Sequence, residues 1–188
     1  MGMNSMNPEA SYPVVVWAGG PDRPGMIAVV ATMLYEKGAN LEHCAMTQLS
    51  GHFTMVMLVS SPVNADELGD YLRSGLAQTH FTDLSVTVRA RPLGSERPLD
   101  GQRCMVSVYG KDRPGIVAVI TTLLAEQGVN VTDATTSVLD AGESVYALLL
   151  EVVLPDGLDV AELGPALSSA AQELGVDASI RPIAVDVF

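Results

Sequence analysis

The residues best suited to chemistry form a short motif that occurs twice in the chain. Asp22-Arg23-Pro24-Gly25 returns 90 residues later as Asp112-Arg113-Pro114-Gly115. Each copy directly precedes an apolar stretch with helical periodicity, so each should lie at a helix N-terminus. Unpaired backbone N–H groups and the positive end of the helix dipole favour a carboxylate there. A ligand carboxylate could bind at this point, and the glycine would let the backbone come close to it.

The same motif has a purely structural interpretation, and the sequence leaves both open. Asp is a good helix cap, Pro suits the first helical turn, and Gly lets a helix lie close to a sheet. On this interpretation Arg23 and Arg113 are simply solvated.

Two asparagines are the next candidates for binding. Asn40 and Asn130 each follow, by two residues, a glycine that should end the helix, Gly38 or Gly128. Each asparagine is either a turn residue that tolerates an unusual φ or a group that reaches a ligand across an interface between modules.

The motif belongs to a longer internal repeat. Residues 22–48 and 112–138 align without a gap, and 11 of the 27 positions are identical, which indicates a duplication. A stretch rich in Pro, Gly and charge separates the copies. We therefore divide the chain into a flexible leader at 1–11, a first module at 12–91, a linker at 92–101 and a second module at 102–188.

Both copies carry the same succession of periodicities. An apolar β-rich run comes first, at Val14–Trp17 and Met105–Tyr109. An apolar stripe at helical spacing, two strands joined by a turn near Ser50-Gly51 or Asp140-Ala141-Gly142, a capped second helix and an alternating strand follow. This order predicts an α+β fold: two ferredoxin-like βαββαβ modules in tandem, each an antiparallel sheet with its helices on one face.

Such a module leaves the other face of its sheet bare. Strand residues such as Met55–Val59 are apolar on more than one face, and an exposed face of that kind favours a partner. We expect the two modules to pack together and the protein to form a homodimer.

Composition and charge exclude several classes of function. The net charge is −12, with −3 in residues 1–94 and −9 in residues 95–188, which disfavours direct binding to nucleic acid. The apolar runs are too short to cross a membrane. Residues 1–11 lack the features of a secretory signal, and Cys44 and Cys104 should be reduced thiols in the cytoplasm. His43 and Cys44 should point to opposite faces of a strand, so we expect no metal site.

A strand, then Asp-Arg-Pro-Gly opening a helix, then Gly-x-Asn opening the next strand together resemble the ACT domain. The resemblance covers both halves of the chain. Within that family, a bare tandem pair resembles the glycine cleavage system transcriptional repressor group, and the hairpin at Gln48–Val59 is especially similar to that group. The same module heads phosphoserine phosphatases, formyltetrahydrofolate deformylases and serine-producing dehydrogenases, whereas we expect no catalytic domain in this protein.

The resemblance implies a ligand site in the loop between first strand and first helix, shared across a module interface. In amino-acid-binding relatives, the residues at the positions of Asp22 and Asp112, and those at Asn40 and Asn130, touch the ligand. Relatives can carry Asn where this chain has Asp, which leaves the identity of the ligand open; an Asp could accept hydrogen bonds from an ammonium group.

The leading hypothesis is a non-enzymatic regulator without a cofactor. It would bind a small amino acid, glycine or serine, and act through a protein partner, with indirect regulation of transcription in glycine or one-carbon metabolism. Its ligand-binding residues would be Asp22, Arg23, Pro24, Gly25, Asn40, Asp112, Arg113, Pro114, Gly115 and Asn130. The alternative is a ligand-free dimerisation module or an accessory subunit of a metabolic enzyme. An enzyme would need a catalytic constellation, and the sequence shows none.

Overall fold

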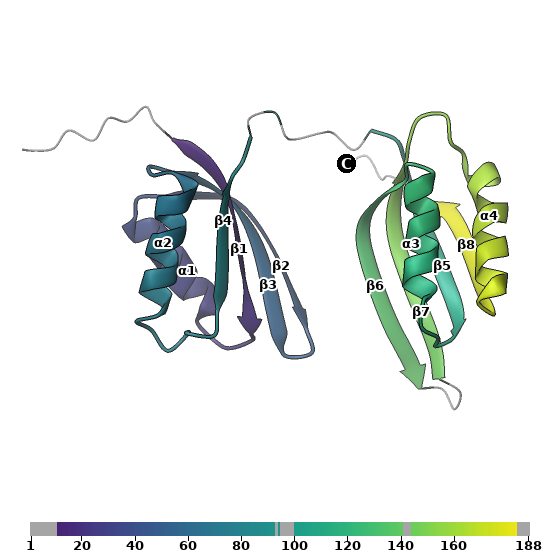
Figure 1. Ribbon diagram of the computed structural model, residues 1–188, viewed down its shortest axis with the longest axis horizontal. Helices are drawn as coiled ribbons and strands as arrows, with labels where there is room; N and C mark the ends of the chain where they lie inside the picture. The colour runs from purple at the N-terminus through teal and green to yellow at the C-terminus, as the bar shows by residue number, and fades with distance from the viewer. Residues whose placement is uncertain (1–10, 93, 95–99, 141–143, 184–188) are drawn as a thin grey trace, which may run out of the picture. The chain divides into compact units, whose positions relative to one another are not determined.

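The computed structural model describes residues 11–92, 94, 100–140 and 144–183 (Figure 1). Contacts divide the chain into two compact units, one within residues 1–97 and the other within residues 98–188. The first contains β1 (Tyr12–Pro21), α1 (Met26–Glu36), β2 (Asn40–Leu49), β3 (His52–Ser61), α2 (Ala65–Leu76) and β4 (Ser85–Ala90). The second contains β5 (Gln102–Lys111), α3 (Ile116–Glu126), β6 (Asn130–Asp140), β7 (Ser144–Leu154), α4 (Val160–Glu173) and β8 (Val176–Pro182).

Each unit has one four-stranded antiparallel sheet. The strand orders are β2-β3-β1-β4 and β6-β7-β5-β8, so the first strand of each unit lies between the third and the last. This is the predicted βαββαβ arrangement, present twice. In the first unit the predicted hairpin turn is at Ser50 and Gly51, both with positive φ, as a tight hairpin requires. The second predicted turn falls largely on residues 141–143, outside the described residues.

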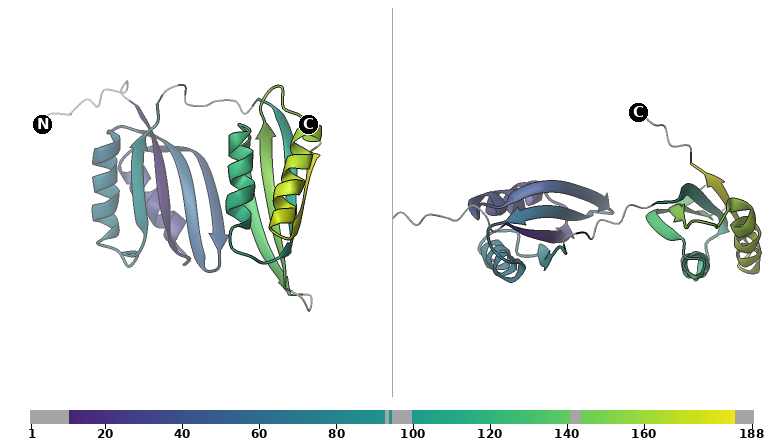
Figure 2. Two further views of the ribbon diagram at one scale, coloured as in Figure 1. Left: turned by 45° about the vertical axis from the view of Figure 1, so that its right-hand side comes forward. Right: turned by 90° about the horizontal axis from the view of Figure 1, so that it is seen from above.

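Strand alternation places the core on one face of each sheet. In β1, the side chains of Val14, Val16 and Ala18 are buried, and they belong to one cluster with the apolar stripes of both α1 and α2. A cluster of the same design joins β5 and β7 to α3 and α4. Both helices of a unit therefore cover the same face of its sheet, as predicted (Figure 2).

The helix ends follow the sequence signals. The side chain of Asn64 accepts a hydrogen bond from the backbone N–H of Glu67 at 3.0 Å, and that of Asp159 accepts one from Glu162 at 3.2 Å. These are the predicted caps of α2 and α4. After α1 and α3 the chain reverses through Gly38 and Gly128, with φ of 77° and 69°, a conformation that a side chain would strain.

The opposite face of each sheet carries apolar side chains that no described helix covers. In the first unit Trp17 and Val56, which are paired across β1 and β3, are 39% and 36% exposed, and Val15 lies beside Leu58 on the same face. In the second unit Tyr109 of β5 is likewise exposed. The predicted bare face is therefore present.

The edge strand β2 is exposed along its whole length. A bulge between Leu41 and His43 interrupts its pairing with β3. At this bulge the Glu42 carboxylate accepts a hydrogen bond from the Ser60 hydroxyl and pairs with the Arg91 guanidinium at 3.1 Å. These two contacts hold the pKa of Glu42 below its usual range.

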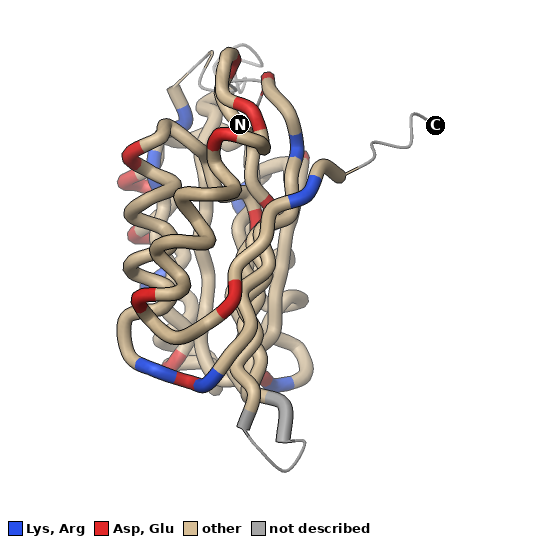
Figure 3. Tube along the Cα trace, turned by 90° about the vertical axis from the view of Figure 1, so that its right-hand side faces the viewer, with Lys and Arg blue, Asp and Glu red and all other residues tan. Residues whose placement is uncertain are grey.

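Among the described residues, no helix is long and apolar enough to span a membrane. Basic positions are interspersed with acidic ones along the trace (Figure 3).

Candidate functional site

The turn between β1 and α1 begins where the sheet ends. The backbone N–H of Asp22 donates to the carbonyl of Gly51 at 2.8 Å, which ties the turn to the β2–β3 hairpin. Gly25 then takes a φ of 96°, and α1 begins at Met26. A left-handed conformation of this kind is strained for any other residue, so the glycine of the motif has a backbone role.

The structural interpretation of the motif was wrong about the aspartate. The cap residue of α1 is Gly25, that of α3 is Gly115, and neither helix has a side-chain capping bond. Among the described residues, the N–H groups of Ile27 and Ala28 also find no backbone acceptor. The start of α1 therefore presents N–H donors and a positive dipole end that no described side chain caps.

A cavity of about 590 Å³ opens at this point in the first module. It is lined by the turn at residues 22–25, by the first residues of α1, and by Met46 of β2 and Phe53 of β3. The Asp22 side chain has no hydrogen bond to another described residue and is exposed at the rim. The first module therefore combines a negative carboxylate, free N–H donors and an apolar wall in one concave site.

The arginine of the first motif is not a free, solvated group. Its guanidinium pairs with the Asp83 carboxylate, donates to the His80 carbonyl at 3.5 Å and lies 5.4 Å from the centre of the Phe81 ring. These contacts fasten the turn to the α2–β4 loop. The ion pair is about 40% exposed, so it contributes only about 0–1 kcal/mol to stability. Arg23 therefore has a structural role, because its guanidinium connects the turn to the α2–β4 loop.

The second module repeats the turn but not this tie. Gly115 has a φ of 100°, and Asp112 and Arg113 are exposed. Arg113 lies beside Gly175, where α4 is followed almost directly by β8, and it has no ion pair or hydrogen bond within the described part of the chain. Burial, and then the nearby Asp112 carboxylate, raise the pKa of Tyr146, so its phenol stays protonated.

The predicted asparagines lie far from the turns of their own modules. Asn40 opens β2 opposite Ser60, whereas the turn follows Pro21, which pairs with His52 at the other end of β3. From His52 to Ser60 is eight residues along β3, roughly 26 Å at about 3.3 Å per residue. Asn130 is placed in the same way in the second module. A single module therefore does not bring Asp22 and Asn40 together.

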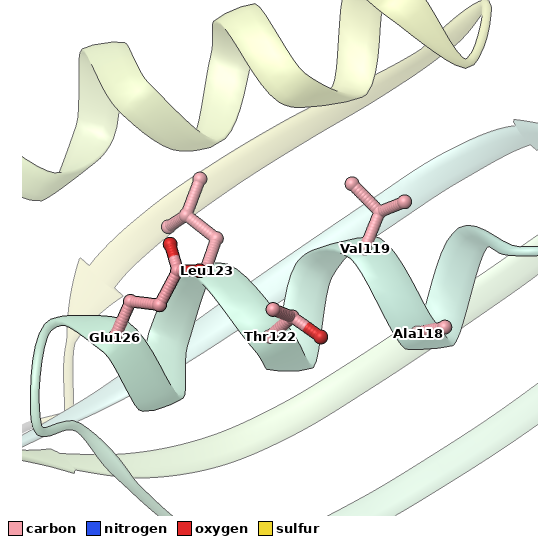
Figure 4. A pocket seen from close by; sticks show the side chains of 5 residues that line it. All are labelled: Ala118, Val119, Thr122, Leu123 and Glu126. Atoms are coloured by element: carbon pink, nitrogen blue, oxygen red, sulfur yellow. The ribbon is translucent and has the colours of Figure 1, made fainter.

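A second region of interest is the side of α1 and α3 that borders the neighbouring helix. Five positions of the helix are identical in the two copies. One of them is buried, Leu34 with Leu124, and the other four are mostly exposed: Ala28, Val29, Thr32 and Glu36, with Ala118, Val119, Thr122 and Glu126. They line grooves of about 420 and 360 Å³, and Figure 4 shows the second set on α3. Buried neighbours have meanwhile changed, for example Val30 to Ile120.

No cluster of three or more His, Cys, Asp or Glu side chains suited to a metal ion occurs in the ranges that the structure describes. His43 and Cys44 occupy successive positions of β2 and so point to opposite faces of the sheet.

A family model of the ACT domain matches residues 13–88 and again residues 102–181. The chain therefore belongs to the ACT domain family and is a tandem pair of such modules. Along 95% of its length it is similar to the glycine cleavage system transcriptional repressor of Escherichia coli strain K12, with 24% identity over 181 residues and 94% of that protein covered.

Two further relatives bear on the architecture. A UPF0237 protein of Methanopyrus kandleri is 39% identical over 80 residues, which is 42% of this chain and 86% of that protein. It therefore corresponds to about one module. The crystal structure of an unknown protein from Galdieria sulphuraria superimposes with a TM-score of 0.75 at 28% identity, covering 93% of this chain and all of that one. The tandem arrangement thus occurs in a solved structure.

Proposed function

We propose that this chain is a non-enzymatic regulator that binds a small amino acid at its Asp-Arg-Pro-Gly turns and acts through a protein partner. The observation that supports it best is the repeated turn, in which a free aspartate stands beside a helix start without a side-chain cap. An amino acid offers the complementary pair of charges. Its carboxylate would accept from the N–H groups of the helix, and its ammonium would donate to Asp22 or Asp112. Pro24 and Pro114 would keep the turn in shape.

Glycine and serine are the first candidates, since a relative that is similar along 95% of the chain is a glycine cleavage system transcriptional repressor. Asn40 or Asn130 of a neighbouring module would complete each site. Binding that favours one packing of modules over another would change the surface offered to the partner, which couples the ligand to the regulated process. Indirect control of transcription in glycine or one-carbon metabolism fits this scheme.

Nuclear magnetic resonance of ¹⁵N-labelled protein tests where the ligand binds. On addition of glycine, amide resonances of residues 22–28 and 112–118 should shift, because the ligand carboxylate becomes their hydrogen-bond acceptor. Glycinamide is the matched control, since it keeps the ammonium group and lacks the carboxylate. Shifts confined to other parts of the chain, or equal shifts with glycinamide, would contradict the proposed site.

The mostly exposed helix positions that are identical in α1 and α3 support contact with a protein partner. Packing constraints act on buried positions, whereas exposed positions are free to drift unless they are used. Here the exposed Ala28, Thr32 and Glu36 are unchanged in the second copy, as is the buried Leu34, while buried Met26 and Val30 are replaced. The first turn of each helix also carries no charged residue, as suits an interface.

The bare sheet face supports a homodimer. Trp17 is the only tryptophan of the chain and lies on that face, so its fluorescence reports on whatever covers it. As the protein concentration rises through the micromolar range, acrylamide quenching of Trp17 should fall while the sedimentation coefficient rises to that of a dimer. Val56→Glu, opposite Trp17 on β3, should abolish both changes, and Gln78→Glu in the exposed turn after α2 should abolish neither. A concentration-independent monomer would refute the homodimer.

We place the protein in the cytoplasm. Cys44 and Cys104 are both free, and burial raises the pKa of Cys104, so it is a packed thiol. Free thiols suit a reducing compartment.

A further inference from the structure

The two modules keep the same turn but differ in the side chains that form the wall of the site. Phe53 of β3 pairs with Gly20 at the end of β1, and Tyr146 of β7 pairs with Gly110 at the end of β5. The two aromatic residues therefore occupy equivalent positions, and a phenol in the second module replaces a phenyl ring in the first.

The neighbouring edge strand shows a second difference of the same kind. Met46 of β2 pairs with Met55, which itself pairs with Ala18. In the second module Thr136 of β6 pairs with Leu148, the residue that stands opposite Val108. Since Ala18 and Val108 are 90 residues apart, as the two motifs are, Met46 and Thr136 are equivalent. Both changes replace an apolar side chain by one with a hydroxyl.

From these differences we propose that the first module binds an amino acid with an apolar side chain and the second binds one with a polar side chain. The proposal rests on the proposed function, since it assigns different ligands to the two turns. Their shared Asp and helix start would hold the common backbone of the amino acid, and the wall would select the side chain.

The first site has the chemistry of an apolar pocket. Its cavity of about 590 Å³ is walled by Met26, Ile27, Met46 and Phe53, and Met46 is 52% exposed, so a ligand could still bury much of it. Arg23, the cation nearest to the ligand, is already held by Asp83. A side chain of the size of leucine or methionine would bury apolar surface here, whereas a ligand hydroxyl would lose its water without gaining a partner from the wall.

The second site offers polar partners at the same positions. The Tyr146 phenol is partly buried and close to Asp112, whose charge helps to keep it protonated, so it can donate as well as accept. Thr136 adds an exposed hydroxyl, and Arg113, which lies beside Gly175, forms no hydrogen bond or ion pair with a described residue. A ligand such as serine would gain hydrogen bonds that leucine leaves unmade, and an unmade bond to a polar wall reduces affinity strongly.

Calorimetric titration of full-length protein tests the assignment. Asp112→Ala leaves only the first site and Asp22→Ala only the second. The Asp112→Ala protein should bind leucine or methionine about tenfold or more tightly than serine, and the Asp22→Ala protein should show the reverse preference. Each preference should reverse when the wall residues of one module are replaced by those of the other. The Asp112→Ala protein then also carries Met46→Thr and Phe53→Tyr, and the Asp22→Ala protein carries Thr136→Met and Tyr146→Phe.

The outcomes separate this proposal from the proposed function. Binding of amino acids with the same preference at both sites, or preferences that the wall exchange leaves unchanged, overturns the assignment and leaves the proposed function standing. No binding of any amino acid to the unmodified chain overturns both. If Phe53→Tyr prevents folding, the single substitution Met46→Thr tests the assignment, because Met46 is largely exposed and its replacement should not disturb the core. This substitution should weaken leucine or methionine binding severalfold and leave serine binding unchanged.

Discussion

Leu72→Ala is expected to lower the free energy of unfolding of the first module by about 2–5 kcal/mol. The Leu72 side chain is completely buried and belongs to the cluster that joins α2 to the sheet. Truncation removes its apolar contacts and leaves a cavity that the densely packed neighbours fill only in part. Leu167, its counterpart on α4, is also completely buried, and Leu167→Ala should cost the second module a similar amount.

Denaturant unfolding measures both effects. Trp17 fluorescence reports on the first module, which contains the only tryptophan of the chain, and circular dichroism reports on the helices of both. Leu72→Met, which nearly preserves volume, is the control and should cost less than about 1.5 kcal/mol. A loss below about 1 kcal/mol for Leu72→Ala would show that α2 is not packed on the sheet in solution.

Local signals in the sequence were sufficient for the elements and their order. Asn64 and Asp159 cap helices as their spacing from Glu67 and Glu162 predicts. Gly38 adopts the left-handed conformation expected after a helix. These features depend on residues three or four positions apart. Because the chain is a duplication, each pattern occurs twice, and each prediction is therefore supported by two separate stretches of sequence.

The candidate site could be predicted only in part, because its remaining members come from distant segments. Phe81 and Asp83, which hold Arg23, lie about 60 residues further along the chain. Met46 and Phe53 reach the turn only through the register of β2, β3 and β1, which no local pattern encodes. The repeat itself could have pointed to Met46 as a member of the site. Its alignment pairs Met46 with Thr136 and so marks a position where the two copies differ in polarity.

The prediction that the motif aspartate caps the helix was wrong for a different reason. An aspartate just before an apolar helical stripe is typical of a cap. Here two residues, Pro24 and a left-handed Gly25, stand between Arg23 and the first residue of α1, so the helix starts later than the cap pattern implies. The displaced Asp22 is left at the rim of the cavity, where a ligand can reach it.

Amino-acid binding should therefore stabilise the protein strongly and through these aspartates. A ligand at 100 times its dissociation constant adds about 2.7 kcal/mol to the folded state, which corresponds to a rise of several degrees in the melting temperature of a domain of this size. Asp22→Ala with Asp112→Ala should abolish the rise, because the ammonium group loses its acceptor in both modules. The pair Asp66→Ala with Asp177→Ala removes the same charge at exposed positions and should leave the rise intact.

Thermal unfolding of the purified chain against the twenty amino acids, with both double variants in parallel, tests amino-acid binding at the turns most directly. At least one amino acid should raise the melting temperature of the unmodified chain and of the Asp66→Ala, Asp177→Ala control by several degrees, and should leave that of the Asp22→Ala, Asp112→Ala protein unchanged. If no amino acid at millimolar concentration moves the melting temperature, the repeated turn is a structural device and the chain is a ligand-free interaction module.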